Sequence, residues 1–519
     1  MERSIGEISS TDEIVFAPKQ KKIQITIFNK NIVSELSEDF VLPDYNPEIR
    51  RLLRIIPYTP IPSCYVNMST AEFAGNVNWS VLYVTNEGKL ASTMLSSPFD
   101  VTAEYDSGEA ADPDGDFSAY DNIRTENIVG RVTAPRKINI KCRLIHSLKI
   151  FGEKSCEAEL FGNTDNPETI KSLTHTIPAC YIKMAYDDSL ELTEALLVAE
   201  NEKIVFCKGN VSMTDSEITS DGIACRGVVN LKCLVSKEGT VPSPTERKIP
   251  FSVTVPAEFD SDGWNPSAHG KISEISFEES ESDTVCLMRL SISAEAQKTE
   301  LVEYTADIFS TKNICECSLT EFPVPSIIFS GKSNFSHDGS SDADGIPDGA
   351  EIIDAIASSE AESVSLENNR YIISGKIKYN VLYGTDGGEY SVRETEFPFR
   401  FDLSEGENSP KDFFVDICVN SVKVRKEGEN IAFSSNMTVN AMVIKETSVN
   451  AISEADFSDE IEQENTSAFT VVYPSSDETL WSIAKRYLTD PSALASSNGI
   501  ASENFDSADS LKETKYLII

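Results

Sequence analysis

Positive charge is scarce in this sequence, which has 45 Lys and Arg residues against 84 Asp and Glu residues and a formal net charge of −39. So acidic a chain repels the phosphate backbone of nucleic acids and the surface of anionic membranes. We therefore expect no nucleic-acid binding unless a basic patch is hidden in the fold. Most of the acidic charge is interpreted as a source of solubility.

Long apolar segments are also missing. No window approaches the roughly 18 consecutive apolar residues that are typical of a transmembrane helix. The N-terminal residues Met1–Glu7 do not begin a basic region followed by an apolar one, so they do not resemble a secretory signal. We therefore expect no membrane insertion and a cytoplasmic location.

Residues for catalysis are few and scattered. None of the four histidines lies near a Gly-x-Ser-x-Gly motif, and no nucleotide-binding Gly-x-x-x-x-Gly-Lys loop is present. The eleven cysteines, from Cys64 to Cys418, have neither zinc nor disulfide spacing. We predict a protein that is not an enzyme and has no cofactor or metal. A hydrolase hidden in the fold is an alternative that would require a pocket of clustered polar groups.

One acidic segment resembles a calcium-binding loop. Residues 340–351 place Asp342, Asp344, Gly345, Asp348 and Glu351 at positions 3, 5, 6, 9 and 12 of such a loop. The first position is a serine where an aspartate is expected, and no clear helix precedes it. We therefore favour an acidic turn over a calcium site.

A glycine-led phrase occurs three times, at Gly75–Tyr83, Gly227–Val235 and Gly375–Tyr383. A Pro-Phe pair follows each copy, and its proline lies 23 residues after the glycine in all three cases. These pairs are Pro98-Phe99, Pro250-Phe251 and Pro398-Phe399. The identical spacing predicts one structural unit repeated about every 150 residues.

The phrase has the pattern of a β-hairpin. In the first copy Val77, Trp79, Val81 and Tyr83 alternate with other residues, as in a half-buried strand. A Gly-containing turn then reverses the chain. The leading glycine indicates a bulge or a close approach of another backbone, and the phenylalanine an aromatic anchor. We assign these residues to the fold and not to any chemistry.

Further patterns complete the repeat. Apolar residues at helical spacing after Pro47 and after Pro347 predict a short helix, over residues 47–56 and 347–356. Alternating runs at 137–144, 285–290 and 416–422 predict additional strands. Each repeat is therefore expected to be mainly β with one short helix.

These patterns predict a mainly β chain of three tandem, sandwich-like repeats at residues 1–165, 166–312 and 313–451. The second repeat is degenerate, because Leu231 and Val235 stand where the first has tryptophan and tyrosine. An acidic linker is expected at 452–466 and a mobile surface loop at 104–117. A separate module is expected at 467–519.

The C-terminal module has the pattern βααβ. Strands are predicted at 469–473 and 515–519, and helices at 480–487 and 491–496. The run Thr479–Tyr487 and the triplet Asn498-Gly499-Ile500 resemble the LysM family. Trp481 is expected to pack in the small core of this module, and a role as an anchor for a binding partner is the alternative.

The LysM resemblance implies binding of N-acetylglucosamine-containing glycans in a groove between the loops 475–479 and 498–514. The candidate binding residues are Ser475, Ser476, Asp477, Glu478, Thr479, Asn498, Gly499 and Ile500. The family's loop glycines are absent here, because Ser476-Asp477-Glu478 and Lys512-Glu513-Thr514 occupy their positions. Glycine permits close approach of a ligand to the backbone, so a protein partner is at least as strongly favoured as a sugar.

The repeats resemble the SPOCS domain of clostridial sporulation proteins, through Leu42–Ile49, Val81-Leu82-Tyr83 and Pro98-Phe99. Three such domains followed by one LysM domain are the layout of clostridial spore-coat morphogenetic proteins. The resemblance implies a sporulation scaffold that docks spore-coat components at the forespore surface, in the mother-cell cytoplasm. It also implies that the LysM domain contacts a coat-basement morphogenetic ATPase. Binding of peptidoglycan through the LysM domain is the alternative.

Overall fold

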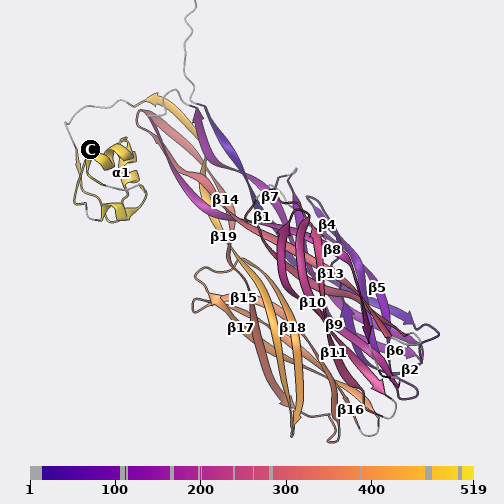
Figure 1. The fold of residues 1–519 in the computed structure, drawn as a ribbon. Coiled ribbons are helices and arrows are strands. Elements are labelled where there is room, and N and C mark those ends of the chain that lie inside the picture. The colour runs from indigo at the N-terminus through magenta and orange to yellow at the C-terminus, as the bar shows by residue number, and fades with distance from the viewer. Residues whose placement is uncertain are drawn as a thin grey trace, which may run out of the picture.

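The computed structural model describes residues 15–519 except for short stretches within this range. These stretches are 106–110, 113–114, 164–168, 197–198, 200, 238–239, 261, 280–283, 386–387, 462–469, 501–504 and 513. The described chain is mainly β, with two short α-helices near its C-terminus (Figure 1). The predicted fold class is therefore confirmed.

The strands before the C-terminal module fall into three consecutive sets. The first set is β1 (Val15–Val41), β2 (Ile49–Tyr58), β3 (Ser63–Val66), β4 (Thr70–Thr85), β5 (Leu90–Glu104), β6 (Phe117–Ala134) and β7 (Lys137–Asn163). The second set is β8 (Ile170–Leu196), β9 (Glu202–Thr219), β10 (Gly222–Lys237), β11 (Ser243–Pro256), β12 (Asn265–Glu279) and β13 (Thr284–Ser310). The third set is β14 (Asn313–Asp342), β15 (Glu351–Glu367), β16 (Arg370–Gly384), β17 (Tyr390–Glu405), β18 (Asp412–Glu427) and β19 (Asn430–Glu460).

Each set forms two antiparallel sheets with the same topology. In one sheet the last strand of the set is central, and it pairs with the first strand and with the second-to-last strand. The orders are β1-β7-β6, β8-β13-β12 and β14-β19-β18. In the other sheet the glycine-bearing strand is central, with β4 between β2 and β5, β10 between β9 and β11, and β16 between β15 and β17. The segments around Gly75, Gly227 and Gly375 therefore fold alike.

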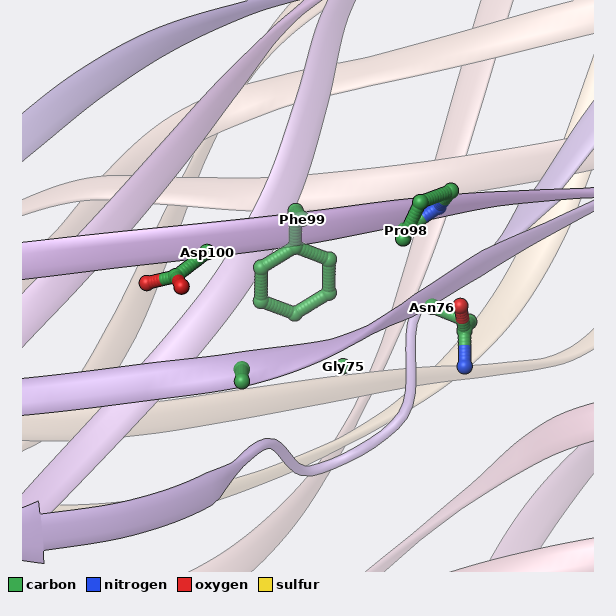
Figure 2. Close-up of a pocket in the computed structure, with 6 residues that line it drawn as sticks. Gly75, Asn76, Pro98, Phe99 and Asp100 are labelled. Atoms are coloured by element: carbon green, nitrogen blue, oxygen red, sulfur yellow. The ribbon is translucent and has the colours of Figure 1, made fainter.

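The repeated glycine and phenylalanine face each other across the hairpin. Gly75 pairs with Phe99, Gly227 with Phe251 and Gly375 with Phe399. A Cβ atom added to these glycines would lie 2.8, 2.5 and 2.6 Å from the nearest atom of the paired ring. Figure 2 shows Phe99 on β5 extending toward β4 near Gly75. The ring occupies the space that a side chain on the glycine would need, which explains the constant spacing.

The tyrosine that ends the phrase also has a structural role. Tyr83 donates a hydrogen bond from its hydroxyl to the Pro47 carbonyl at 3.2 Å, and Tyr383 donates one to the Gly345 carbonyl at 3.1 Å. Each bond holds the loop that leads into the hairpin sheet. Val235 has no hydroxyl, so the degenerate second repeat lacks this bond.

The two predicted short helices are wrong. The residues of 49–56 and 351–356 belong to the strands β2 and β15. Register shifts interrupt their pairing at Ile49/Arg51, Leu52/Arg54 and Ile352/Asp354. A β-bulge inserts one residue and breaks the period-two alternation, so the apolar residues acquire a helix-like spacing without forming a helix.

The predicted acidic linker is also wrong over its first half. Strand β19 continues to Glu460 and pairs with β14 as far as Asn313. Ile452 and Ala455 are buried within this extension. The residues 462–466 of the predicted linker, and 106–110 and 113–114 of the predicted surface loop, lie outside the described residues.

Three equivalent repeat positions meet at the centre of the molecule. Leu82, Leu234 and Leu382 each lie seven residues after the repeated glycine and share one buried cluster. Their partners on the neighbouring strands are Arg54, Phe206 and Asp354. The Arg54 Nη1 atom lies 2.6 Å from Asp354 Oδ2, and the guanidinium lies 5.9 Å from the centre of the Phe206 ring. The repeats thus surround an approximate threefold axis.

The long first and last strands of the three repeats extend together away from this centre (Figure 1). They share a second apolar cluster to which every repeat contributes. Its buried members are Ile23, Ile25, Cys156, Ala179, Val302, Phe322, Val324, Val449 and Ala451. The three repeats are therefore packed into one body along much of their length.

Candidate binding module

The C-terminal module has the predicted βααβ order. Its elements are β20 (Val471–Val472), α1 (Leu480–Arg486), α2 (Pro491–Ser497), the 3₁₀ helix η1 (Ala508–Leu511) and β21 (Leu517–Ile518). Leu480, Ile483, Leu494 and Leu517 form its buried centre. Strands β20 and β21 pair antiparallel, with Val471 opposite Ile518 and Val472 opposite Leu517.

Both helices begin at side-chain caps. The Thr479 hydroxyl accepts a hydrogen bond from the Ser482 amide at 3.1 Å, and the Ser482 hydroxyl accepts one from the Thr479 amide at 3.0 Å. Asp490 accepts bonds from the amides of Ser492 and Ala493 at the start of α2. Such caps satisfy amides that have no partner inside the helix. Thr479, predicted as a binding residue, is thus required for the start of α1.

The module rests on the second repeat through Asp307 of β13. The Trp481 indole Nε1 donates a hydrogen bond to Asp307 Oδ2 at 2.8 Å, and Lys485 Nζ lies 2.6 Å from Asp307 Oδ1. The ring of Phe309 meets the Trp481 ring edge to face, with centroids 5.1 Å apart. Trp481 is buried as predicted, but it lies between the module core and the second repeat.

Two further ion pairs flank this contact. Lys171 of β8 pairs with Asp490, and His175 Nε2 lies 3.3 Å from Asp506 Oδ2. Burial opposes ionisation of Asp490, but hydrogen bonds from Lys171, Ser492 and Ala493 outweigh it and hold the pKa of this carboxyl well below its ordinary value. We call the surface formed by Lys171, Leu173, His175, Asp307 and Phe309 the module seat. Figure 1 shows the module beside the end of the long strands.

No residue pattern in the sequence marks the module seat. Asp307 and Trp481 are 174 residues apart, and Asp307 is one acid among 84. No local pattern marks it as a partner of α1. Only the packing of β13 beside the module reveals it.

The first predicted binding loop is partly closed by its own contacts. Glu478 Oε2 accepts hydrogen bonds from the Ser475 amide and hydroxyl at 2.8 and 3.1 Å, and its other oxygen pairs with Arg486. The bond from the Ser475 amide and the contact with Arg486 lower the pKa of Glu478. Ser475, Ser476 and Asp477 are exposed. Ser476 and Asp477, which bond each other at 2.6 Å, are the residues of this loop best placed for an external partner.

The second predicted binding loop begins with a structural asparagine. Asn498 Nδ2 donates to the Ile518 carbonyl at 2.9 Å, and Oδ1 accepts from the Ile518 amide at 2.7 Å. The side chain therefore acts as an additional pairing partner for β21. Gly499 adopts a positive φ of 67°, and Ile500 packs partly buried against the module core. Residues 501–504 and 513 of this loop lie outside the described residues.

The outer side of the two-stranded sheet is apolar and exposed. Val472 and Leu517 point to the helices and are buried, whereas Val471, Tyr473, Tyr516 and Ile518 are 41%, 75%, 52% and 44% exposed. The two tyrosine rings lie 6.5 Å apart at an interplanar angle of 59°. We call these four residues the apolar sheet face. The sequence contains its signal, because apolar residues occupy both the inward and the outward positions of the two strands.

The calcium-like segment spans the end of β14, the loop 343–350 and Glu351, the first residue of β15. Arg393 donates a hydrogen bond to the Asp344 carbonyl at 2.6 Å, and Lys426 Nζ lies 3.6 Å from Asp348 Oδ1. Ala343 and Ile346 are buried beneath it. Within the described ranges, no group of three or more His, Cys, Asp or Glu residues is arranged to hold a metal ion.

The hairpin of the first repeat carries a shallow depression, shown in Figure 2. Its lining consists of Ala74, Gly75, Asn76, Pro98, Phe99 and Asp100. Asp100 is the one titratable group of this lining, so the depression does not contain the clustered polar groups that the hydrolase alternative requires. Among the helices that the structure describes, none has the length and apolar character needed to cross a bilayer.

Comparison with known proteins identifies one part of the chain. The family model of the LysM domain matches residues 475–504, which include α1, α2 and the first predicted binding loop. No curated protein matches the chain, and no solved structure does. The C-terminal module seated on the second repeat is therefore a LysM domain.

Proposed function

We propose that the protein is a non-enzymatic adaptor, in which a body of three β-sandwich repeats presents a LysM domain to a binding partner. The observation that supports this proposal is that the two sides of the LysM domain have different environments. One side, with Trp481 and Lys485, is bound to Asp307 of the body, while the apolar sheet face is exposed. This arrangement fixes the LysM domain on the body and leaves the apolar sheet face free to bind a second molecule.

The finer proposal places this adaptor in the assembly of a spore coat. It is supported by the resemblance of Leu42–Ile49 and of the hairpin phrase to SPOCS domains, and by three repeats of one topology. In this proposal the protein acts in the mother-cell cytoplasm at the forespore surface. Its LysM domain contacts the coat-basement ATPase, and the repeats dock other coat components.

Affinity capture from sporulating cells tests this assignment. The full-length chain is compared with a chain that ends at Glu464 and so lacks the LysM domain. Recovery of the coat-basement ATPase with the full-length chain, and its loss with the shortened chain, is the expected result. Equal recovery with both chains contradicts a LysM-mediated contact.

Binding of peptidoglycan is the second candidate, and the match to the LysM family favours it. Ser476 and Asp477 are exposed in the loop where the resemblance places the glycan groove. Against it stand the missing loop glycines and the engagement of Asn498 with β21. Co-sedimentation with purified murein sacculi separates the two candidates. Retention that is lost in Ser476→Ala/Asp477→Ala supports glycan binding, and absence of retention contradicts it.

A further inference from the structure

The apolar sheet face is unusual for a sheet that is covered by helices on one side only. In antiparallel sheets of this kind the uncovered side normally carries polar residues. Here the outward side chains are apolar or aromatic and exposed. They are Val471 of β20, Ile518 of β21 and the flanking Tyr473 and Tyr516. Such a contiguous exposed patch marks a surface of interaction.

The chemistry of this face suits a protein side chain better than a sugar. Two aliphatic side chains, Val471 and Ile518, lie opposite each other beside the tyrosine pair. Aliphatic groups offer nothing to the hydroxyl groups of a sugar, whereas an apolar anchor packs against both them and the rings. Exposed tyrosines surrounded by aliphatic contacts are typical centres of protein interfaces.

Charge restricts the choice of partner. No side chain of the face is charged, Asp477 in the loop after Tyr473 and Lys515 beside Tyr516 are both exposed, and the chain as a whole has a net charge of −39. A second copy of the chain would bring the same negative charge, so repulsion opposes self-association through this face. A partner whose contact surface carries Lys and Arg residues is attracted instead.

We propose that the apolar sheet face is the docking surface of the LysM domain for a protein partner that inserts an apolar anchor flanked by Lys or Arg side chains. This inference rests on the proposed adaptor function and adds the surface and the chemistry of the partner. The module seat has already engaged Trp481 and Lys485. The partner therefore binds the LysM domain on its sheet side while the domain remains on the second repeat.

The test uses the full-length protein and three probes at equal concentration. The first is a fluorescein-labelled peptide with a Leu-Trp-Leu centre between two Lys-Lys ends, the second is the same peptide with Glu in place of Lys, and the third is chitohexaose. We expect the lysine peptide to bind and the glutamate peptide not to bind. The variant Tyr473→Ser/Tyr516→Ser should weaken binding of the lysine peptide at least tenfold.

The matched control is Tyr487→Ser, which alters an exposed tyrosine of the same domain outside the sheet face. It should retain wild-type affinity, and both variants should keep the circular dichroism spectrum of the wild type. Equal weakening in both variants, or none in either, overturns the proposal. Binding of chitohexaose that is lost only in the double variant also overturns it, in favour of a glycan at this face. A dimer in sedimentation analysis that the double variant dissolves overturns it in favour of self-association.

The adaptor function itself can survive such a failure. If the double variant still captures the same partner from sporulating cells as the wild type, the sheet face is not the docking surface, but the LysM domain remains the binding module. If the chain ending at Glu464 also captures that partner, the proposed function fails as well. The two results are therefore distinguishable.

Discussion

Single glycines hold the hairpins of this protein closed against an aromatic ring. The demand differs among the repeats, because a Cβ at Gly375 would lie 2.0 Å from the Glu360 carbonyl oxygen as well as 2.6 Å from the Phe399 ring. At Gly75 the closest atoms belong to the end of the Phe99 ring, at 2.8 Å, which can rotate away. A side chain is therefore harder to accommodate at Gly375 than at Gly75.

Substituting these glycines should therefore give unequal losses of stability. We expect Gly375→Ala to lower the free energy of unfolding by about 3 kcal/mol, near the upper end of typical overpacking costs, because backbone atoms must move. Gly75→Ala should cost about 1 kcal/mol. Urea unfolding of the two variants under identical conditions measures the difference. Equal losses would contradict the role assigned to the Glu360 carbonyl.

A buried histidine between two repeats makes stability depend on pH. His269 lies 3.6 Å from Glu295 and 3.3 Å from Asp416 of the third repeat. Burial by itself lowers the pKa of His269, but the ion-pair interactions with Asp416 and Glu295 outweigh it and raise the pKa from 6.5 to about 10. The folded protein therefore holds this proton more tightly than the unfolded chain does.

The sign of the effect follows from the raised pKa. The stabilisation from protonated His269 is fully present below pH 6.5 and is lost as the pH rises through about 10. The temperature at the midpoint of thermal unfolding of the wild type should decrease as the pH is raised from 7 to 10. In His269→Gln this decline should be shallower, relative to the same variant at pH 7. Parallel declines in both proteins would show that another group is responsible.

At the scale of elements, the sequence was a good guide wherever alternation was regular. Period-two or helical spacing predicts the hairpins, the two LysM helices and the segments 137–144, 285–290 and 416–422 of β7, β13 and β18, but not the full length of the long strands. The strands β2 and β15 were misread because bulges disturb their alternation. The end of β19 was misread because its carboxylates hide the buried Ile452 and Ala455. The many carboxylates of this segment indicate that one face of the strand is exposed to solvent. They do not reveal that the other face is buried and that the backbone pairs with β14.

The candidate site shows the same limit. The LysM helices and their flanking loops are encoded locally, and the sequence identified them. The module seat is not encoded locally, because Asp307 and Phe309 come from a strand of another domain. Contacts between segments so far apart depend on the packing of whole elements, which residue patterns do not contain.

The contact between α1 and β13 can be tested by charge reversal. Asp307→Lys places a cation beside Lys485 and removes the acceptor of the Trp481 indole. We expect the LysM domain to leave its seat and the fluorescence of Trp481 to shift to longer wavelength, in a protein where Trp79 and Trp264 are replaced by Phe. Because Lys485 is 42% exposed, the associated loss of stability should stay near 1 kcal/mol.

Two variants make this result specific. The double variant Asp307→Lys/Lys485→Asp restores opposite charges and should recover part of the original emission. Arg486→Ala removes the neighbouring cation, which pairs with Glu478 inside the LysM domain, and should leave the emission unchanged. A spectral shift in Arg486→Ala as large as that in Asp307→Lys would argue against the seat.

At the scale of the whole molecule, two buried ion pairs, Arg54–Asp354 and Lys149–Asp412, link the first and third repeats. The side chains of Arg54 and Asp354 are 1% and 5% exposed, and Lys232 of the second repeat lies 2.7 Å from the same carboxylate. Burial raises the pKa of Asp354, but Arg54 and Lys232 outweigh this and lower it. The carboxylate thus joins all three repeats at their common axis.

Removing this carboxylate should destabilise the body strongly. Asp354→Asn leaves the buried Arg54 and the partly exposed Lys232 without a counter-charge, and we expect a loss of about 3–5 kcal/mol, as for other broken buried pairs. Urea unfolding followed by far-ultraviolet circular dichroism gives the value. The exposed pair between Arg400 and Glu367 supplies the comparison, since Glu367→Gln should leave stability nearly unchanged. Similar losses in both variants would show that the axial pair does not hold the repeats together.

Arg54, Phe206 and Asp354 occupy one position of the repeat with three unlike side chains. Three identical subunits could never achieve this, because any residue chosen there would meet two copies of itself. Because the three repeats belong to one chain, each copy can carry a different side chain at this position, matched to its neighbours. The order of the repeats along the chain therefore matters, because the LysM domain that follows the third repeat is bound through Asp307 of the second.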